Sequence, residues 1–115
     1  MSEIFYIKQN DTLPSLLVEN MAYGDGTPVV FAAGDVGIFN MRLASDPEAT
    51  PKISGGTVTL NTGLASCVYP WQPNDTDTAG DYHAEVEVTF ASGGKATWPN
   101  FTNFIIRITD DLDNN

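Results

Sequence analysis

The run Asp77-Thr-Ala-Gly-Asp-Tyr82-His-Ala-Glu-Val-Glu-Val-Thr-Phe90 carries an unbroken alternation of apolar and polar residues. From Tyr82 onward, one set consists of Tyr82, Ala84, Val86, Val88 and Phe90, and the other of His83, Glu85, Glu87 and Thr89. A period of two places each set on its own face of a β-strand. We therefore predict a half-buried antiparallel strand whose acidic face meets solvent.

Turn signals bound this strand on both sides. The polar loop from Gln72 to Ala79 precedes it and shows no periodicity. Ala91-Ser-Gly-Gly94 follows it and predicts a hairpin that leads into a second strand, Lys95–Trp98.

Short apolar runs alternate with turn residues along the rest of the chain. The further predicted strands are Ile4–Lys8, Leu13–Asn20, Val29–Phe31, Val36–Leu43, Thr57–Leu60, Leu64–Trp71 and Phe104–Ile108. Asp25-Gly26 predicts the tip of a type I′ hairpin, and Asn61-Thr-Gly63 predicts a three-residue hairpin connection. The spacing indicates one all-β domain over residues 1–109, an antiparallel β-sandwich, followed by an acidic tail over residues 110–115.

The composition argues against several classes of function. The net charge is −10, and the five basic residues are scattered singly along the chain. Such a chain cannot track phosphates, so we expect neither nucleic-acid binding nor attraction to anionic membranes. The N-terminal residues MSEIFYIKQ lack the pattern of a signal peptide, and no apolar stretch approaches the ~20 residues that span a bilayer. We expect a soluble protein made in the cytoplasm.

The single cysteine, Cys67, rules out an intramolecular disulfide and a cysteine-based zinc site. It lies in an apolar run, so we expect it to be a small buried hydrophobic residue.

Three aspartates in one region raise the question of a calcium site. Asp75, Asp77 and Asp81 could offer oxygen ligands, but the glycine and glutamate of an EF-hand loop are missing. Aspartates in such loops commonly accept turn and cap hydrogen bonds, and we expect that role here.

Catalytic residues are equally unsupported. His83 is the only histidine, it lies on the polar face of its strand, and no serine or cysteine stands in a nucleophile motif. Glu85 and Glu87 read as solvated residues that discourage edge pairing. We expect no enzyme activity, no catalytic residue, no metal and no cofactor.

Tyr82 also carries a resemblance to a known fold. A tyrosine just inside a strand, two residues after Gly80, resembles the start of the penultimate strand of immunoglobulin-like domains. In those domains the tyrosine hydroxyl bonds back to the backbone across the corner. Antibody domains have a cysteine two residues later, where this chain has Ala84. The resemblance implies an immunoglobulin-like sandwich without a disulfide.

A second resemblance covers nearly the whole chain. Its motifs, in order, are Asp11-Thr-Leu-Pro-Ser-Leu16, Asp25-Gly-Thr-Pro-Val29, Phe39-Asn-Met-Arg42, Trp71 with Asp75-Thr-Asp-Thr-Ala-Gly80, Glu85-Val-Glu-Val-Thr-Phe90, Trp98-Pro-Asn100 and Ile105-Ile-Arg-Ile108. This order resembles the N-terminal domain of phage baseplate upper proteins, an immunoglobulin-like module that anchors receptor-binding parts to the virion. Ala32-Ala-Gly-Asp35 and Asn100-Phe-Thr-Asn103 depart from that pattern, and we expect a chain without the fibre-forming region of those proteins.

The resemblance implies a virion structural protein, assembled in the host cytoplasm, that serves as an adaptor or decorating subunit on tail, baseplate, neck or capsid. We expect its partners to be other virion proteins, with the chain itself in a homo-oligomer or in many copies per particle. The residues expected to make these contacts are Ile4, Tyr6, Ile7, Trp98 and Phe101. Trp71 is expected in the core. The alternative function is a module that binds carbohydrate or a host-surface ligand through exposed aromatic rings and loop aspartates.

Overall fold

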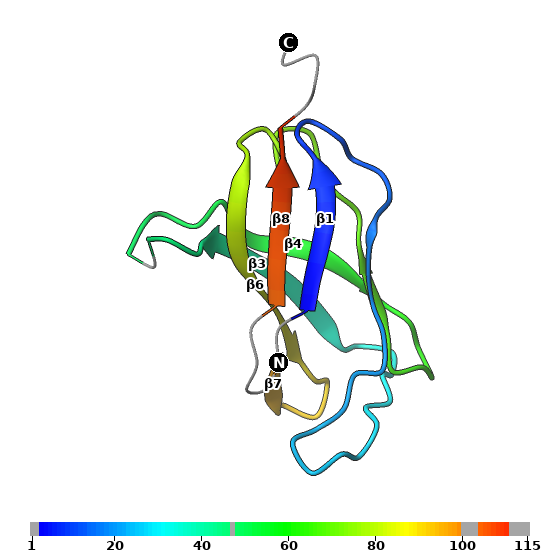
Figure 1. Cartoon of the computed structure of the whole chain (residues 1–115). Helices are drawn as coiled ribbons and strands as arrows, with labels where there is room; N and C mark the ends of the chain where they lie inside the picture. The colour runs from blue at the N-terminus through cyan, green and yellow to red at the C-terminus, as the bar shows by residue number, and fades with distance from the viewer. Residues whose placement is uncertain (1–2, 47, 100–103, 111–115) are drawn as a thin grey trace.

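The computed structural model describes residues 3–46, 48–99 and 104–110, and all regular structure within these ranges is β-strand (Figure 1). The strands are β1 (Glu3–Lys8), β2 (Leu16–Val18), β3 (Val36–Leu43), β4 (Ile53–Leu60), β5 (Cys67–Tyr69), β6 (Gly80–Thr89), β7 (Lys95–Trp98) and β8 (Phe104–Thr109). Among the described residues there is no helix long and apolar enough to cross a membrane. The predicted all-β class is confirmed.

The strands form one sheet that nearly closes into a barrel, in the order β1-β8-β6-β3-β4-β5-β2, with β7 also paired to β6. Strand β4 is the turning point, because its first part pairs with β3 while Thr59 and Leu60 pair with β5. The predicted division into two separate sheets is therefore not confirmed by the strand pairing. One pair also departs from the antiparallel expectation, since β1 runs parallel to β8 in a regular register of six residues (Figure 1).

Strand β6 lies between β8 and β3 in the sheet, and the predicted half-buried antiparallel strand is confirmed. Tyr82, Ala84, Val86 and Val88 are buried, and the residues between them point outward. On one side β6 pairs with β3 along eight residues. On the other side its first half pairs with β8 and its second half with β7, across the predicted hairpin.

The hydroxyl of Tyr82 makes the expected corner bond. It donates to the backbone carbonyl of Thr78 at 2.9 Å, while the ring lies in the core at 2% exposure. Burial raises the pKa of this phenol. The bond fixes the loop before β6 to the start of the strand.

Aromatic rings fill the core in two groups. Phe39, Tyr69 and Trp71 pack together, with Phe5 of β1 against Trp71. The second group consists of Tyr23, Phe31, Phe90 and Trp98. The core position predicted for Trp71 is confirmed, and its buried Nε1 has no hydrogen-bond partner among the described residues.

Cys67 is buried as predicted, and burial raises the pKa of its thiol to about 11.

Several predicted strands are shorter, longer or absent. Phe31 forms only an isolated bridge, so the predicted strand Val29–Phe31 is wrong. Strand β4 starts at Ile53 rather than Thr57. The added part of the strand contains Gly55 in a left-handed conformation, with φ of 74°, which glycine adopts without a steric penalty. The predicted strand Leu64–Trp71 is reduced to β5, because the connection from β4 runs through residue 66.

The hairpin tip at Asp25-Gly26 is not of type I′. That type needs a positive φ at both central residues, and here only Gly26 has one. The Asp25 carboxylate instead accepts the backbone N–H of Thr27 at 2.9 Å, which is the side-chain bond typical of aspartate in turns.

Candidate interaction surface

The outer face of the sheet is the set of side chains on β1, β8, β6 and β3 that point away from the core. On β1 it carries Ile4 and Tyr6, which are 39% and 59% exposed. Between and after them, Phe5 is half-buried and Ile7 is buried. Alternation along β1 thus leaves two large apolar side chains in solvent beside the edge of the sheet.

Tyr6 belongs to a cross-strand row with Arg107 and Asp81. Tyr6 is in register with Arg107, and Arg107 is in register with Asp81. The guanidinium lies 5.6 Å from the centre of the Tyr6 ring and donates two hydrogen bonds to Asp81, at 2.8 and 2.9 Å. These bonds hold the pKa of the Asp81 carboxyl below its usual range and raise the pKa of Arg107. The bidentate pair holds the cation against the tyrosine ring.

A second row starts at Ile4 and crosses the sheet. Ile4 is in register with Ile105, Ile105 with His83, and His83 with Arg42. The row therefore leads from the apolar edge strand to the polar part of the outer face.

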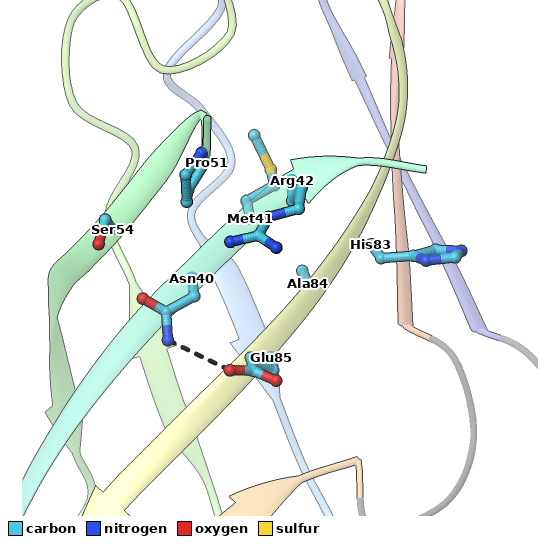
Figure 2. A pocket seen from close by; sticks show the side chains of 8 residues that line it. All are labelled: Asn40, Met41, Arg42, Pro51, Ser54, His83, Ala84 and Glu85. Carbon is cyan, nitrogen blue, oxygen red and sulfur yellow. Dashed lines mark hydrogen bonds between the residues drawn. The ribbon is translucent and has the colours of Figure 1, made fainter. Parts of the chain in front are cut away.

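That polar part contains a hollow of about 420 Å³ (Figure 2). Its lining residues are Asn40, Met41, Arg42, Pro51, Ser54, His83, Ala84 and Glu85. The hollow lies where the register between β3 and β4 shifts, between Phe39 and Met41. Asn40 bridges this shift, because its Oδ1 accepts the Gly55 N–H at 2.9 Å and its Nδ2 donates to Glu85 at 3.3 Å. In Figure 2 the His83 ring points away from the bond between Asn40 and Glu85.

The three loop aspartates do not come together. Asp75 accepts the Tyr69 hydroxyl at 2.6 Å and the Gln72 N–H at 2.8 Å, which confirms the expected turn role. Asp77 forms an ion pair with Lys52, which sequence analysis missed, and this contact lowers the pKa of the carboxyl. Asp81 is paired with Arg107. Within the described residues no group of three or more His, Cys, Asp or Glu side chains could hold a metal ion.

The structure separates the five expected contact residues. Ile4 and Tyr6 are exposed on the outer face. Ile7 is buried at 5% exposure, because it lies on the inward side of β1 in register with buried Ile108. Phe101 lies outside the described residues.

The expectation that Trp98 is an exposed contact residue is also corrected. The residue is 6% exposed, it lies opposite buried Val86, and its Nε1 donates to the Ala22 carbonyl at 2.7 Å. A buried indole with a satisfied N–H is a core residue.

Sequence reasoning missed the row of Tyr6, Arg107 and Asp81 and the hollow beside Asn40. Both depend on which residues lie opposite each other across strands far apart in sequence. Period-two alternation in Ile4–Lys8 would, however, have separated outward Tyr6 from inward Ile7.

No family model matches the chain, and no curated protein matches it in sequence. The fold and the surface by themselves define an all-β protein whose sheet exposes apolar side chains on an edge strand.

Proposed function

We propose that the chain is a structural subunit of a bacteriophage particle and that it works through protein–protein contacts on the outer face of β1 and β8. The observation that carries the proposal is the exposure of Ile4 and Tyr6, side by side with the fixed Arg107 guanidinium. Aromatic and arginine side chains are the usual energetic centres of protein interfaces.

The Tyr6 ring is suited to such a contact because little freedom remains to be lost on binding. The Arg107 guanidinium packs against it and is itself tied to Asp81. Preorganised side chains bind more tightly, because their ordering cost is already met in the free protein. Burying an aromatic anchor of this kind is worth about 2 kcal/mol or more in a well-packed interface.

The phage assignment draws on the sequence resemblance, and two structural features are compatible with its immunoglobulin-like module. The Tyr82 hydroxyl makes the corner bond to Thr78, and the only cysteine is unpaired. In this reading the protein assembles in the host cytoplasm and occupies repeated positions on the virion, beside other virion proteins.

A carbohydrate-binding or host-surface-binding module is the second candidate. The hollow favours it, because Asn40, Arg42, Ser54 and Glu85 offer donors and acceptors for sugar hydroxyls. Against it, both tryptophans are buried and provide no stacking platform.

Particle incorporation tests the proposal. Tagged Tyr6→Ser and Leu64→Ser chains, supplied together during phage growth, compete with the unaltered protein for places on the virion. Leu64 is the matched control because it is 60% exposed and lies in the β4–β5 loop. We expect Y6S to be incorporated at least about tenfold less than L64S, which corresponds to about 1.4 kcal/mol of contact energy. Equal incorporation of the two variants would show that the outer face does not make the contact. Absence of the unaltered chain from purified particles would contradict the proposal that it is a structural subunit. Retention of glycans by the purified chain would favour the second candidate.

A further inference from the structure

Strand β1 is an edge strand whose four central residues lack the usual protection. Within the described part of the chain it pairs only with β8, so no strand is hydrogen-bonded to the other side of its backbone. Its register with β8 is continuous over six residues, without a bulge. Between Glu3 and Lys8 the sequence Ile-Phe-Tyr-Ile contains no charge and no proline. Natural sheets usually blunt such edges with charges, prolines, bulges or short strands.

The other edges of the sheet do carry such devices. Strand β2 is only three residues long, with Pro14 before it and Glu19 after it. Strand β7 is four residues long, begins at Lys95 and is followed by Pro99. The contrast singles out β1 as the edge where a further strand can add.

The charges at the C-terminal end of β1 indicate the chemistry of the added strand. Asp11 and Asp110 are exposed beside this end, since Asp11 N–H bonds to the Lys8 carbonyl and Thr109 is in register with Lys8. Asp77 also lies close, because its carbonyl accepts the Gln9 side chain at 2.8 Å, but Lys52 neutralises it. Lys8 offsets one of the two remaining carboxylates, which leaves this end negative in a chain of net charge −10.

A second copy of the chain fits this edge poorly. Two copies would each bring a net charge of −10 to the contact.

We propose that the open edge of β1 binds an extended segment of a different protein, which adds as an antiparallel strand with an apolar centre and a lysine or arginine at the end beside Lys8. This inference rests on the proposed structural role and names the kind of partner that would fill it. Main-chain hydrogen bonds to β1 supply the affinity, Ile4 and Tyr6 cover one side of the added strand, and the carboxylates of Asp11 and Asp110 attract its basic residue.

Three synthetic peptides test the inference on the full chain. The first has a Val-Thr-Val-Ile-Val core with a pair of lysines at its N-terminus. The second replaces the lysines by glutamates, and the third is the first with alternate backbone nitrogens methylated. Amide hydrogen exchange, resolved by residue, reports where each peptide binds.

We expect the lysine peptide to slow exchange of the β1 amides that point away from β8 by about tenfold or more at saturation, and to leave β3 unchanged. The glutamate peptide should protect them much less, and the methylated peptide should not protect them. Ile4→Lys should abolish the protection, whereas Val36→Lys, on the interior strand β3, should retain it.

Four results would overturn the inference. Equal protection by the methylated peptide would rule out strand addition, and equal protection by the glutamate peptide would rule out the charge preference. Absence of protection by any peptide would show that β1 is not a docking edge. Protection of β1 that rises with protein concentration alone would make a second copy the occupant. None of these results bears on whether the chain is incorporated into particles, so the two proposals fail separately.

Discussion

Strands β1 and β6 follow the same two-residue alternation but meet solvent in opposite ways. The outward residues of β6 from residue 83 onward are polar, namely His83, Glu85, Glu87 and Thr89. The outward residues of β1 include Ile4 and Tyr6. Strand β6 lies between partners on both sides, whereas β1 has one partner. Strand β6, which has partners on both sides, presents polar side chains to water, whereas β1, which has one partner, presents Ile4 and Tyr6. We read that difference as the division between scaffold and contact surface.

The largest effect should come from a charge on the inner side of β6. Val88 is 0% exposed, so Val88→Asp would bury an unpaired carboxylate and should lower the free energy of unfolding by more than about 4 kcal/mol. Thr89→Asp, one residue further and exposed, should change it by less than about 0.5 kcal/mol. Urea denaturation measures both. Similar values for the two variants would mean that the faces of β6 are wrongly assigned.

A smaller effect is expected from the corner bond at the start of β6. Tyr82→Phe keeps the buried ring but removes the hydroxyl that donates to Thr78. The loss should be about 1–2 kcal/mol, because the net value of the bond is lost and a partly buried carbonyl is left without its partner. Chemical denaturation again provides the measurement, and an unchanged midpoint would show that the bond does not stabilise the corner.

Two ion pairs, Arg107 with Asp81 and Lys52 with Asp77, should make stability depend on pH in the acid range. Hydrogen bonds from Arg107 lower the pKa of Asp81, and those from Lys52 and Thr78 lower the pKa of Asp77. A carboxyl whose pKa is lower in the folded state contributes stability above its unfolded value of about 3.9 and loses it as pH falls further. Denaturation midpoints should therefore decline below about pH 4, and Asp81→Asn should make that decline shallower. An identical decline in the variant would mean that the ion pair does not persist in solution.

Only a small change in stability is expected from the exposed residues of β1. Ile4→Thr and Tyr6→Ser should each alter the free energy of unfolding by less than about 1 kcal/mol, because both side chains are already exposed to solvent on the outer face. A loss comparable with that of V88D would show that Ile4 and Tyr6 belong to the core of the fold, and the contrast between β1 and β6 would fail.

The sequence predicted those strands whose own residues alternate between apolar and polar. Alternation defined β6 and the bounds of β3, Val36–Leu43. It did not reveal the first half of β4, because Gly55 and Gly56 have no side chains to show a period. Gly56 is required there by a close approach, since a Cβ would lie 2.7 Å from the Tyr69 ring.

The candidate surface was predicted only in part, for a related reason. Ile4 and Tyr6 could be chosen from their own segment, but the partner of Tyr6 depends on a parallel pairing of the first strand with the last. Trp98 was misjudged because the neighbouring Pro99 suggested a strand end on the surface, while the indole turns inward to the Ala22 carbonyl. Such tertiary hydrogen bonds leave no local signal in the sequence.

The parallel pairing of β1 with β8 also determines how the protein would carry mechanical load. Glu3 begins β1 at one end of the pair and Thr109 ends β8 at the other end (Figure 1). Tension between them would pull the two strands past each other along their length. All six register pairs would then resist together, in shear, instead of opening one after another as in a zipper.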